Sequence, residues 1–212
     1  MAPRPYKSAS REEAAERTRV KLVAAAANLL SSAGDFSLDA VAKQAGVTRL
    51  TVYNQFGSRR ALLEAVFDDR AARGGLHRIA DAMADPDPQA GLRKLVAIFC
   101  DFWSYDEGGL QGLHAASGTD AEFRDSLTAR NERRRKALST LLHRMPAAAR
   151  TDKATLRDLA DTLFALTSLH FFSALSTHGR SKSDVCEIVR ELIDGALARA
   201  LPMNNLSEGS QD

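Results

Sequence analysis

The sequence contains few of the residues that define several large classes of protein. Its 212 residues include two cysteines, six prolines and one tryptophan. Cys100 and Cys186 are far apart and have no metal-ligand spacing, which argues against a disulfide framework and fits a reducing cytoplasm. No apolar run approaches the roughly 18 residues that span a bilayer, and no apolar core follows the basic N-terminus as it would in a secretory signal. These absences predict a cytoplasmic protein that has no membrane partner.

The motifs of common enzymes are missing as well. The sequence contains no HExxH, CxxC or GxSxG motif and no phosphate-binding glycine loop. His114 and His143 lie near acidic residues, but this signal is too weak to suggest catalysis. We therefore expect no enzyme activity, no cofactor and no metal. A small-molecule enzyme or carrier, in which the N-terminal part is only scaffold, is kept as an alternative.

Charge is distributed unevenly along the chain. The formal net charge is only +2, but residues 1–60 hold ten lysines and arginines against five acidic residues. A basic N-terminal region on a mildly acidic body suggests that this region meets a polyanion, although chance alone can produce such a difference.

Apolar residues recur at helical spacing almost throughout, and no alternating run of strand length is present. The pattern predicts an all-α protein of about nine helices. Capping boxes are expected at Ser10 and Thr119, stops at Gly34 and Gly46, and a final helix from about Ser183.

Residues 37–60, SLDAVAKQAGVTRLTVYNQFGSRR, predict two short helices joined by a tight turn. Gly46 can adopt the positive φ of the turn, and Thr48 can cap the second helix. One side of the pair is apolar and is expected to face inward, with Val41, Ala42, Ala45, Val52 and Phe56. The other side of the second helix is expected to present Arg49, Leu50, Thr51, Tyr53 and Asn54.

These outward side chains suit a DNA groove. Arg49 can donate two hydrogen bonds to guanine, and Leu50 or the Thr51 methyl can contact a thymine methyl. Hydroxyl, amide and basic side chains can hold phosphates, as can the free N–H groups of helices that start at Ser37 and Ser58. Taken singly, each residue also has an ordinary explanation: Tyr53 as a half-buried core residue, Lys43 and Arg59 as solvated charges.

Residues 17–67 resemble the DNA-binding domain of the TetR family of transcriptional regulators. The resemblance is carried by Arg19 to Ala26, by VAKQAGVT at 41–48, by TVYNQF at 51–56 and by GSRRAL at 57–62. Leu50 departs from the small residue that the family often has there, and Arg59 replaces its usual lysine. The resemblance implies a helix-turn-helix domain at 10–60 and a helical ligand-binding and dimerisation domain at 61–201. The polar residues at 202–212 predict a disordered tail. It implies a surface for double-stranded operator DNA made of Arg17, Arg19, Ser37, Lys43, Thr48, Arg49, Leu50, Thr51, Tyr53, Asn54, Ser58 and Arg59.

The resemblance also implies a chamber for a small apolar or aromatic effector. The candidate lining residues are Phe99, Phe102, Trp103, His114, Phe164, Thr167, His170 and Phe171. Their spacing equally fits an ordinary core. The basic run from Arg130 to Lys136 fits a solvated helix face, with the alternative that one arginine turns inward toward an anionic ligand.

The last two expected helices carry broad apolar stripes, which the family pairs with a second copy to form a four-helix bundle. The residues expected at this homodimer interface are Leu159, Leu163, Val185, Ile188, Val189, Leu192, Ile193 and Ala196. Packing within one chain is the alternative. The resemblance thus implies a repressor that an effector releases from a palindromic operator, with a constitutive, ligand-free DNA-binding regulator as the competing interpretation.

Overall fold

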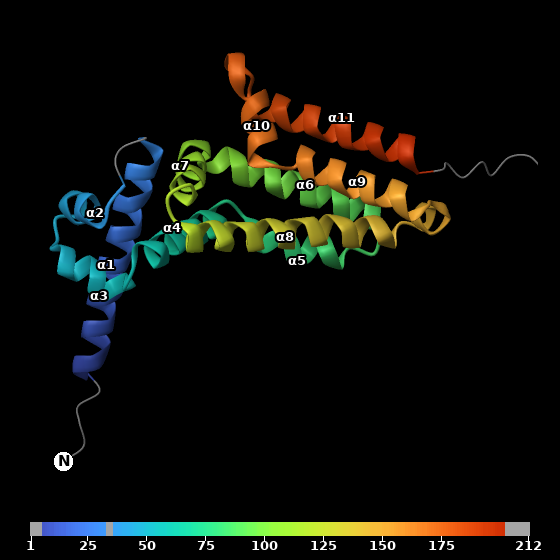
Figure 1. Ribbon diagram of the computed structural model, residues 1–212. Helices are drawn as coiled ribbons and strands as arrows, with labels where there is room; N and C mark the ends of the chain where they lie inside the picture. The colour runs from blue at the N-terminus through green and yellow to red at the C-terminus, as the bar shows by residue number, and fades with distance from the viewer. Residues whose placement is uncertain (1–5, 33–35, 202–212) are drawn as a thin grey trace, which may run out of the picture. The chain divides into compact units, whose positions relative to one another are not determined.

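The computed structural model describes residues 6–32 and 36–201, which form helices and connecting turns without a strand (Figure 1). The all-α prediction is confirmed. The α-helices are α1 (Tyr6–Ser31), α2 (Leu38–Ala45), α3 (Arg49–Phe56), α4 (Arg59–Arg73), α5 (Ile79–Ala84), α6 (Pro88–Tyr105), α7 (Glu107–Ser117), α8 (Ala121–Arg144), α9 (Lys153–Leu166), α10 (Leu169–Leu175) and α11 (Lys182–Ala200). None of these helices is long and apolar enough to cross a membrane.

Eleven α-helices replace the expected nine because two long helices are interrupted. The expected fourth helix breaks after α4, where Gly75 adopts a φ of 82° before a short 3-10 turn leads into α5. The expected eighth helix breaks at Thr167, and the hydroxyl of Ser168 then caps α10 by accepting from Phe171 N. Periodicity persists across both breaks, so the sequence pattern did not reveal them.

Both predicted capping boxes are wrong. The first helix begins at Tyr6, so Ser10 lies inside it. At the second site, Asp120 is the cap, because its carboxylate accepts a hydrogen bond from Phe123 N at 3.0 Å. A true capping box occurs at Ser181 and Asp184, at the start of α11. The expected stop at Gly34 and the expected tail at 202–212 lie outside the described residues.

The chain divides into two compact units. The first, here called the head unit, contains residues 1–73 and 106–128, and the second, the body unit, contains residues 74–105 and 129–212. The expected boundary at residue 60 does not coincide with this division, since α4 beyond that residue, α7 and the start of α8 group with the N-terminal helices.

In the head unit, α1 packs against α2, α4 and α7. The unit's core includes Leu22, Val52, Leu62 and Leu63, which are fully buried. Gly112 lets α7 approach α1 closely, because a Cβ at that position would lie 2.2 Å from the Leu30 carbonyl oxygen. Helix α7 is therefore part of the packing that holds α1 in place.

In the body unit, α11 packs against both α9 and α6 (Figure 1). The buried residues of α6 and α11 include Leu95, Phe102, Val185 and Val189. The apolar stripe of α11 is thus satisfied in large part within one chain.

Candidate nucleic-acid interface

The turn between α2 and α3 has the geometry that the sequence predicts. Gly46 has a φ of 63° and a ψ of 40°, in the left-handed region that glycine adopts without a steric penalty. Thr48 has extended backbone angles, and its hydroxyl accepts a hydrogen bond from Thr51 N at 3.2 Å. Val41 and Val52 are fully buried beneath the turn. The corner therefore fixes α3 against the rest of the head unit.

The outer face of α3 is open to solvent. Leu50 is 66% exposed and Tyr53 is 58% exposed, which is unusual for large apolar and aromatic side chains. Arg49 and Asn54 are also exposed, and Thr51 is half-buried. An exposed face that combines an arginine, an amide, an aromatic ring and an aliphatic group offers both donors and apolar contacts to a groove.

Arg49 is already engaged within the chain. Its Nη1 lies 3.1 Å from a carboxylate oxygen of Asp39 on α2. Both side chains are largely exposed, so solvent screens the pair and it contributes little to stability. Breaking this pair costs little free energy, so Arg49 can move to a stronger acceptor.

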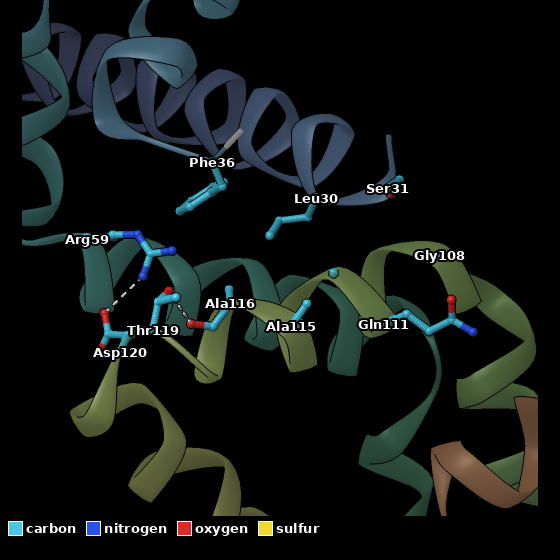
Figure 2. Close-up of a pocket in the computed structure, with 11 residues that line it drawn as sticks. Leu30, Ser31, Phe36, Arg59, Gly108, Gln111, Ala115, Ala116, Thr119 and Asp120 are labelled. Atoms are coloured by element: carbon cyan, nitrogen blue, oxygen red, sulfur yellow. Dashed lines mark hydrogen bonds and ion pairs between the residues drawn. The ribbon is translucent and has the colours of Figure 1, made fainter. Parts of the chain in front are cut away.

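Arg59, at the start of α4, has less freedom. Its Nη1 lies 3.3 Å from Asp120, and its guanidinium lies 5.2 Å from the centre of the Phe36 ring. These groups border a cavity of about 730 Å³ within the head unit. Figure 2 shows Phe36 and Leu30 on one side of it and α7 with Ala115 and Ala116 on the other, with Arg59 and Asp120 at one end. A phosphate contact by Arg59 therefore requires that this pair loosen.

The remaining predicted DNA residues fall into two groups. Ser37 and Ser58 cap α2 and α4, since their hydroxyls accept from Ala40 N and Ala61 N. Arg17 and Lys43 are exposed, with Arg17 3.9 Å from Glu13. Arg19 is half-buried and lies over the Phe56 ring at 4.8 Å, which ties α1 to the end of α3. Arg19 thus has a packing role whether or not it meets DNA.

Comparison with known proteins agrees with this architecture. The family model described as bacterial regulatory proteins, tetR family, matches residues 22–66. The matched segment runs from α1 to α4 and includes the turn and the exposed helix α3 described above, so this part of the chain is similar to the DNA-binding domain of that family. The match supports a DNA-binding role for the helices around the turn.

Solved structures with the same fold cover nearly the whole chain. A protein described as a TetR-family transcriptional regulator from a Rhodococcus species is 18% identical, with a TM-score of 0.69 over 86% of this chain and 100% of its own. NalD of Pseudomonas aeruginosa, described as the secondary repressor of the MexAB-OprM multidrug efflux pump, is 21% identical, with a TM-score of 0.64 over 91% of this chain and 99% of its own. No curated protein sequence matches the chain. At these identities the structures establish the TetR-family fold and nothing finer.

The residues predicted to line an effector chamber lie in different surroundings. Phe99, Phe102 and Trp103 are buried and pack on one another, with ring centres 6.2 Å apart for Phe99 and Trp103 and 4.6 Å apart for Phe102 and Trp103. The indole N–H of Trp103 donates to the Thr167 carbonyl at 3.0 Å. These contacts are those of a packed core.

The other predicted chamber residues lie apart from this cluster or at its edge. Phe164 is half-buried and His170 is exposed, while Phe171 is half-buried. His114 belongs to α7 in the head unit and not to the body unit that holds the rest. Seven of the eight residues therefore belong to the body unit and one to the head unit.

One arginine of the basic run in α8 does turn inward. Arg134 is 6% exposed, and its guanidinium donates to the Phe164 carbonyl at 2.7 Å and to the Thr167 hydroxyl at 2.6 Å. It also lies 4.0 Å from the centre of the Phe164 ring. Burial lowers the pKa of Arg134 to about 10, and repulsion from Arg135 acts in the same direction. Within the described residues, no carboxylate forms an ion pair with it.

The predicted dimer residues divide sharply by burial. Leu159, Leu163, Val185, Val189, Ile193 and Ala196 are buried within the single chain. These six residues pack within one chain, where the apolar stripes of α9 and α11 lie against each other and the core of the body unit. Leu192 is 44% exposed and Ile188 is half-buried, so these two remain available to a second copy.

Sequence reasoning missed the acidic partners of the basic residues. Asp39 follows the Ser37 cap by two residues and so had a local reason to lie near the start of α2. Asp120 lies far from Arg59 in sequence, and only the packing of the head unit brings them together. Arg60 and Glu122 form a second such pair at 3.0 Å.

Proposed function

We propose that this chain is a transcriptional repressor that binds a palindromic operator as a homodimer and leaves it when a small molecule binds. The observation that carries the DNA-binding part is the exposed face of α3, fixed by a well-formed turn. In this proposal Arg49 and Leu50 contact base edges, and Thr51, Tyr53 and Asn54 hold the phosphate backbone. Two heads would contact half-sites about 34–36 Å apart, or a multiple of one helical turn.

The place of the effector is proposed from the cavity of the head unit. Its volume of about 730 Å³ lies within the range of small-molecule sites. It adjoins Arg59, the first residue of α4, and α1, which packs on α2. A ligand that wedges against Phe36 would shift the population of head conformations away from the one that fits DNA. The effector is expected to be compact and partly apolar, in keeping with walls that mix Leu30 and alanines with polar groups.

The DNA-binding part is tested by selecting preferred duplexes from a random library and measuring affinity by fluorescence anisotropy. Arg49→Ala is expected to weaken binding to the selected sequence and to relax the preference at one base pair in each half-site, with a loss of about 1–3 kcal/mol. Arg93→Ala, an exposed arginine on α6, is the matched control and should leave affinity unchanged. A selection that returns no sequence preference would refute operator recognition.

The effector part is tested separately. A metabolite panel screened by thermal shift should yield a compound that raises Tm and lowers operator affinity, and by linkage DNA should weaken its binding equally. Ala115→Trp, which fills the cavity, should abolish the response while DNA binding remains. If compounds bind and operator affinity does not change, the chain is a constitutive regulator, which is the competing interpretation.

A further inference from the structure

Helices α6 and α11 pack with a regular antiparallel register. At one end, the Lys182 ammonium donates to the Ser104 carbonyl. Further along, Val96, Arg93 and Gln89 of α6 line the same narrow cleft as Arg190, Ile193 and Leu197 of α11. These residues follow one another at intervals of eight, three and four back along α6 and at the same intervals forward along α11, and such intervals keep residues on one face of a helix.

The two cysteines of the chain occupy the one matching position between these contacts. Cys100 lies four residues before Ser104, and Cys186 lies four residues after Lys182. Neither is in a disulfide. The Cys100 thiol can donate a hydrogen to the Cys186 sulfur, which lowers the pKa of Cys186 and, together with burial, raises that of Cys100. The register and the interaction between the thiols agree that the two sulfurs are neighbours.

The surroundings of the two sulfurs differ in a way that assigns them separate roles. Cys186 is half-buried, whereas Cys100 is almost completely buried. The hydrogen bond from Cys100 lowers the pKa of Cys186, burial and the charge of Asp101 oppose this, and Arg190, one turn after Cys186 on α11, lowers the pKa further. On α6, Asp101 follows Cys100, but it is ion-paired with Arg78 at 2.6 Å. An oxidant from solvent therefore meets Cys186 first.

We propose that Cys100 and Cys186 are a peroxide-reactive thiol pair that closes to a disulfide between α6 and α11. The Cys186 thiolate attacks one peroxide oxygen, the O–O bond breaks, and the leaving hydroxide takes a proton to form water. Cys186 is then a sulfenic acid. The Cys100 sulfur attacks the Cys186 sulfur, the S–O bond breaks, and the thiol proton leaves with the hydroxyl as a second water. The two thiols lose two electrons, and the peroxide gains them.

The disulfide would join positions far apart in sequence across two neighbouring helices. Such a link restricts the unfolded chain strongly, so it should stabilise the body unit. It would also tie α11, which carries the exposed Leu192, to α6. Oxidation would thus act on the same helix that is proposed to contact a second copy.

The test uses the full chain, which is first reduced with dithiothreitol and then freed of the reductant. Samples at decreasing protein concentration are exposed to the same concentration of hydrogen peroxide. Intact mass spectrometry should show the loss of two hydrogens per chain, independent of protein concentration and reversed by dithiothreitol. Peptide mapping without reduction should link the segments that contain residues 100 and 186. The oxidised protein should melt several degrees above the reduced protein.

Two variants separate the roles of the thiols. Cys100→Ser should leave Cys186 to accumulate a sulfenic acid that a dimedone probe captures, and Cys186→Ser should react far more slowly with peroxide. The proposal is overturned if wild-type chains gain only oxygen atoms, if the linkage forms only between chains, or if both variants react at the wild-type rate. Because the chain has no other cysteine, each of these outcomes is unambiguous.

Discussion

At the scale of single residues, two arginines of the predicted DNA surface are already ion-paired with carboxylates of the same chain. Arg49 pairs with Asp39, and Arg59 pairs with Asp120. The first pair is exposed and adds little stability, whereas the second is part-buried, and each places a negative charge beside a group that would otherwise attract phosphate. The acidic partners therefore lower the affinity of the head for any polyanion and leave more of the binding energy to contacts with bases.

Replacing Asp39 with Asn should strengthen DNA binding. The change releases Arg49 and removes one negative charge near the interface, so affinity should rise several-fold for specific and non-specific duplexes alike, and more at low salt. Anisotropy titrations across a range of salt concentrations measure both effects. Asp158→Asn, an exposed carboxylate on α9, serves as the control for net charge. Equal gains from both variants would show that Arg49 is not restrained by Asp39.

Arg134 illustrates a different use of charge. Its guanidinium meets carbonyl and hydroxyl groups at the carboxyl end of α9, where the helix dipole is negative. Because the pKa in the folded state is about 10, below the ordinary value of 12.5, the folded state loses this proton first as pH rises. The unfolded chain then binds more protons, so this group's contribution to stability increases between those two pH values.

Replacing Arg134 with Met should destabilise the body unit by about 2–4 kcal/mol. The buried Phe164 carbonyl and Thr167 hydroxyl would lose their donor, and this loss should exceed the gain from removing a desolvated charge. Urea unfolding followed by circular dichroism gives the free energy of unfolding. Arg133→Met, one residue earlier and exposed, should change it by less than about 0.5 kcal/mol. A stability at or above wild type for Arg134→Met would show that desolvation dominates.

At the scale of elements, the turn between α2 and α3 depends on one backbone conformation. Gly46→Ala should lower the free energy of unfolding of the head unit by about 1–2 kcal/mol, because an alanine at φ 63° meets its own backbone. Gly46→Asn should recover much of this loss, since asparagine tolerates the left-handed region. Thermal unfolding of the two variants compares them directly. If alanine and asparagine behave alike, the effect comes from side-chain volume near Lys21 and not from φ.

Helix positions were predictable from the sequence where a local signal marks them. The caps at Ser37 and Thr48 and the stop at Gly46 are encoded within a few residues, and the structure has all three. The start of α8 was placed one residue early because Thr119 and Asp120 are both good caps, and only the backbone geometry chooses between them. The break at Thr167 was not predicted, although Ser168 is a local cap there; Arg134 and Trp103 add hydrogen bonds to Thr167 from distant parts of the sequence.

At the scale of the whole molecule, the proposed homodimer can use only the exposed residues of α11. Leu192→Glu should convert the proposed dimer to a monomer that is still folded, with the helical content of the wild type, because this side chain is 44% exposed within one chain. Ile193→Glu should instead unfold the chain, because that side chain is 3% exposed. Sedimentation velocity and circular dichroism distinguish the two results. A Leu192→Glu variant that stays dimeric would place the interface elsewhere.

The sequence predicted those features of the candidate site that depend on residues close together in the chain. The composition of the α3 face follows from helical spacing, and the structure exposes that face. The effector residues were chosen by aromatic character, which marks a packed core as well as a chamber, and the structure places His114 in the other compact unit. The pairing of Arg59 with Asp120 and the match of Cys100 with Cys186 arise from helix packing between distant segments, so one sequence could not indicate them.

The close approach of α7 to α1 bears on how chimeric regulators should be assembled. A chimera could exchange the N-terminal helices that carry the proposed DNA-binding surface, and the turn after α3 would be the simplest junction. Yet Gly112 sits against the Leu30 carbonyl, so a graft that ends near residue 60 would set a foreign α7 against this α1. Any side chain at the matching position would collide there. A functional exchange must therefore carry residues 106–128 together with the N-terminal helices, as a single discontinuous module.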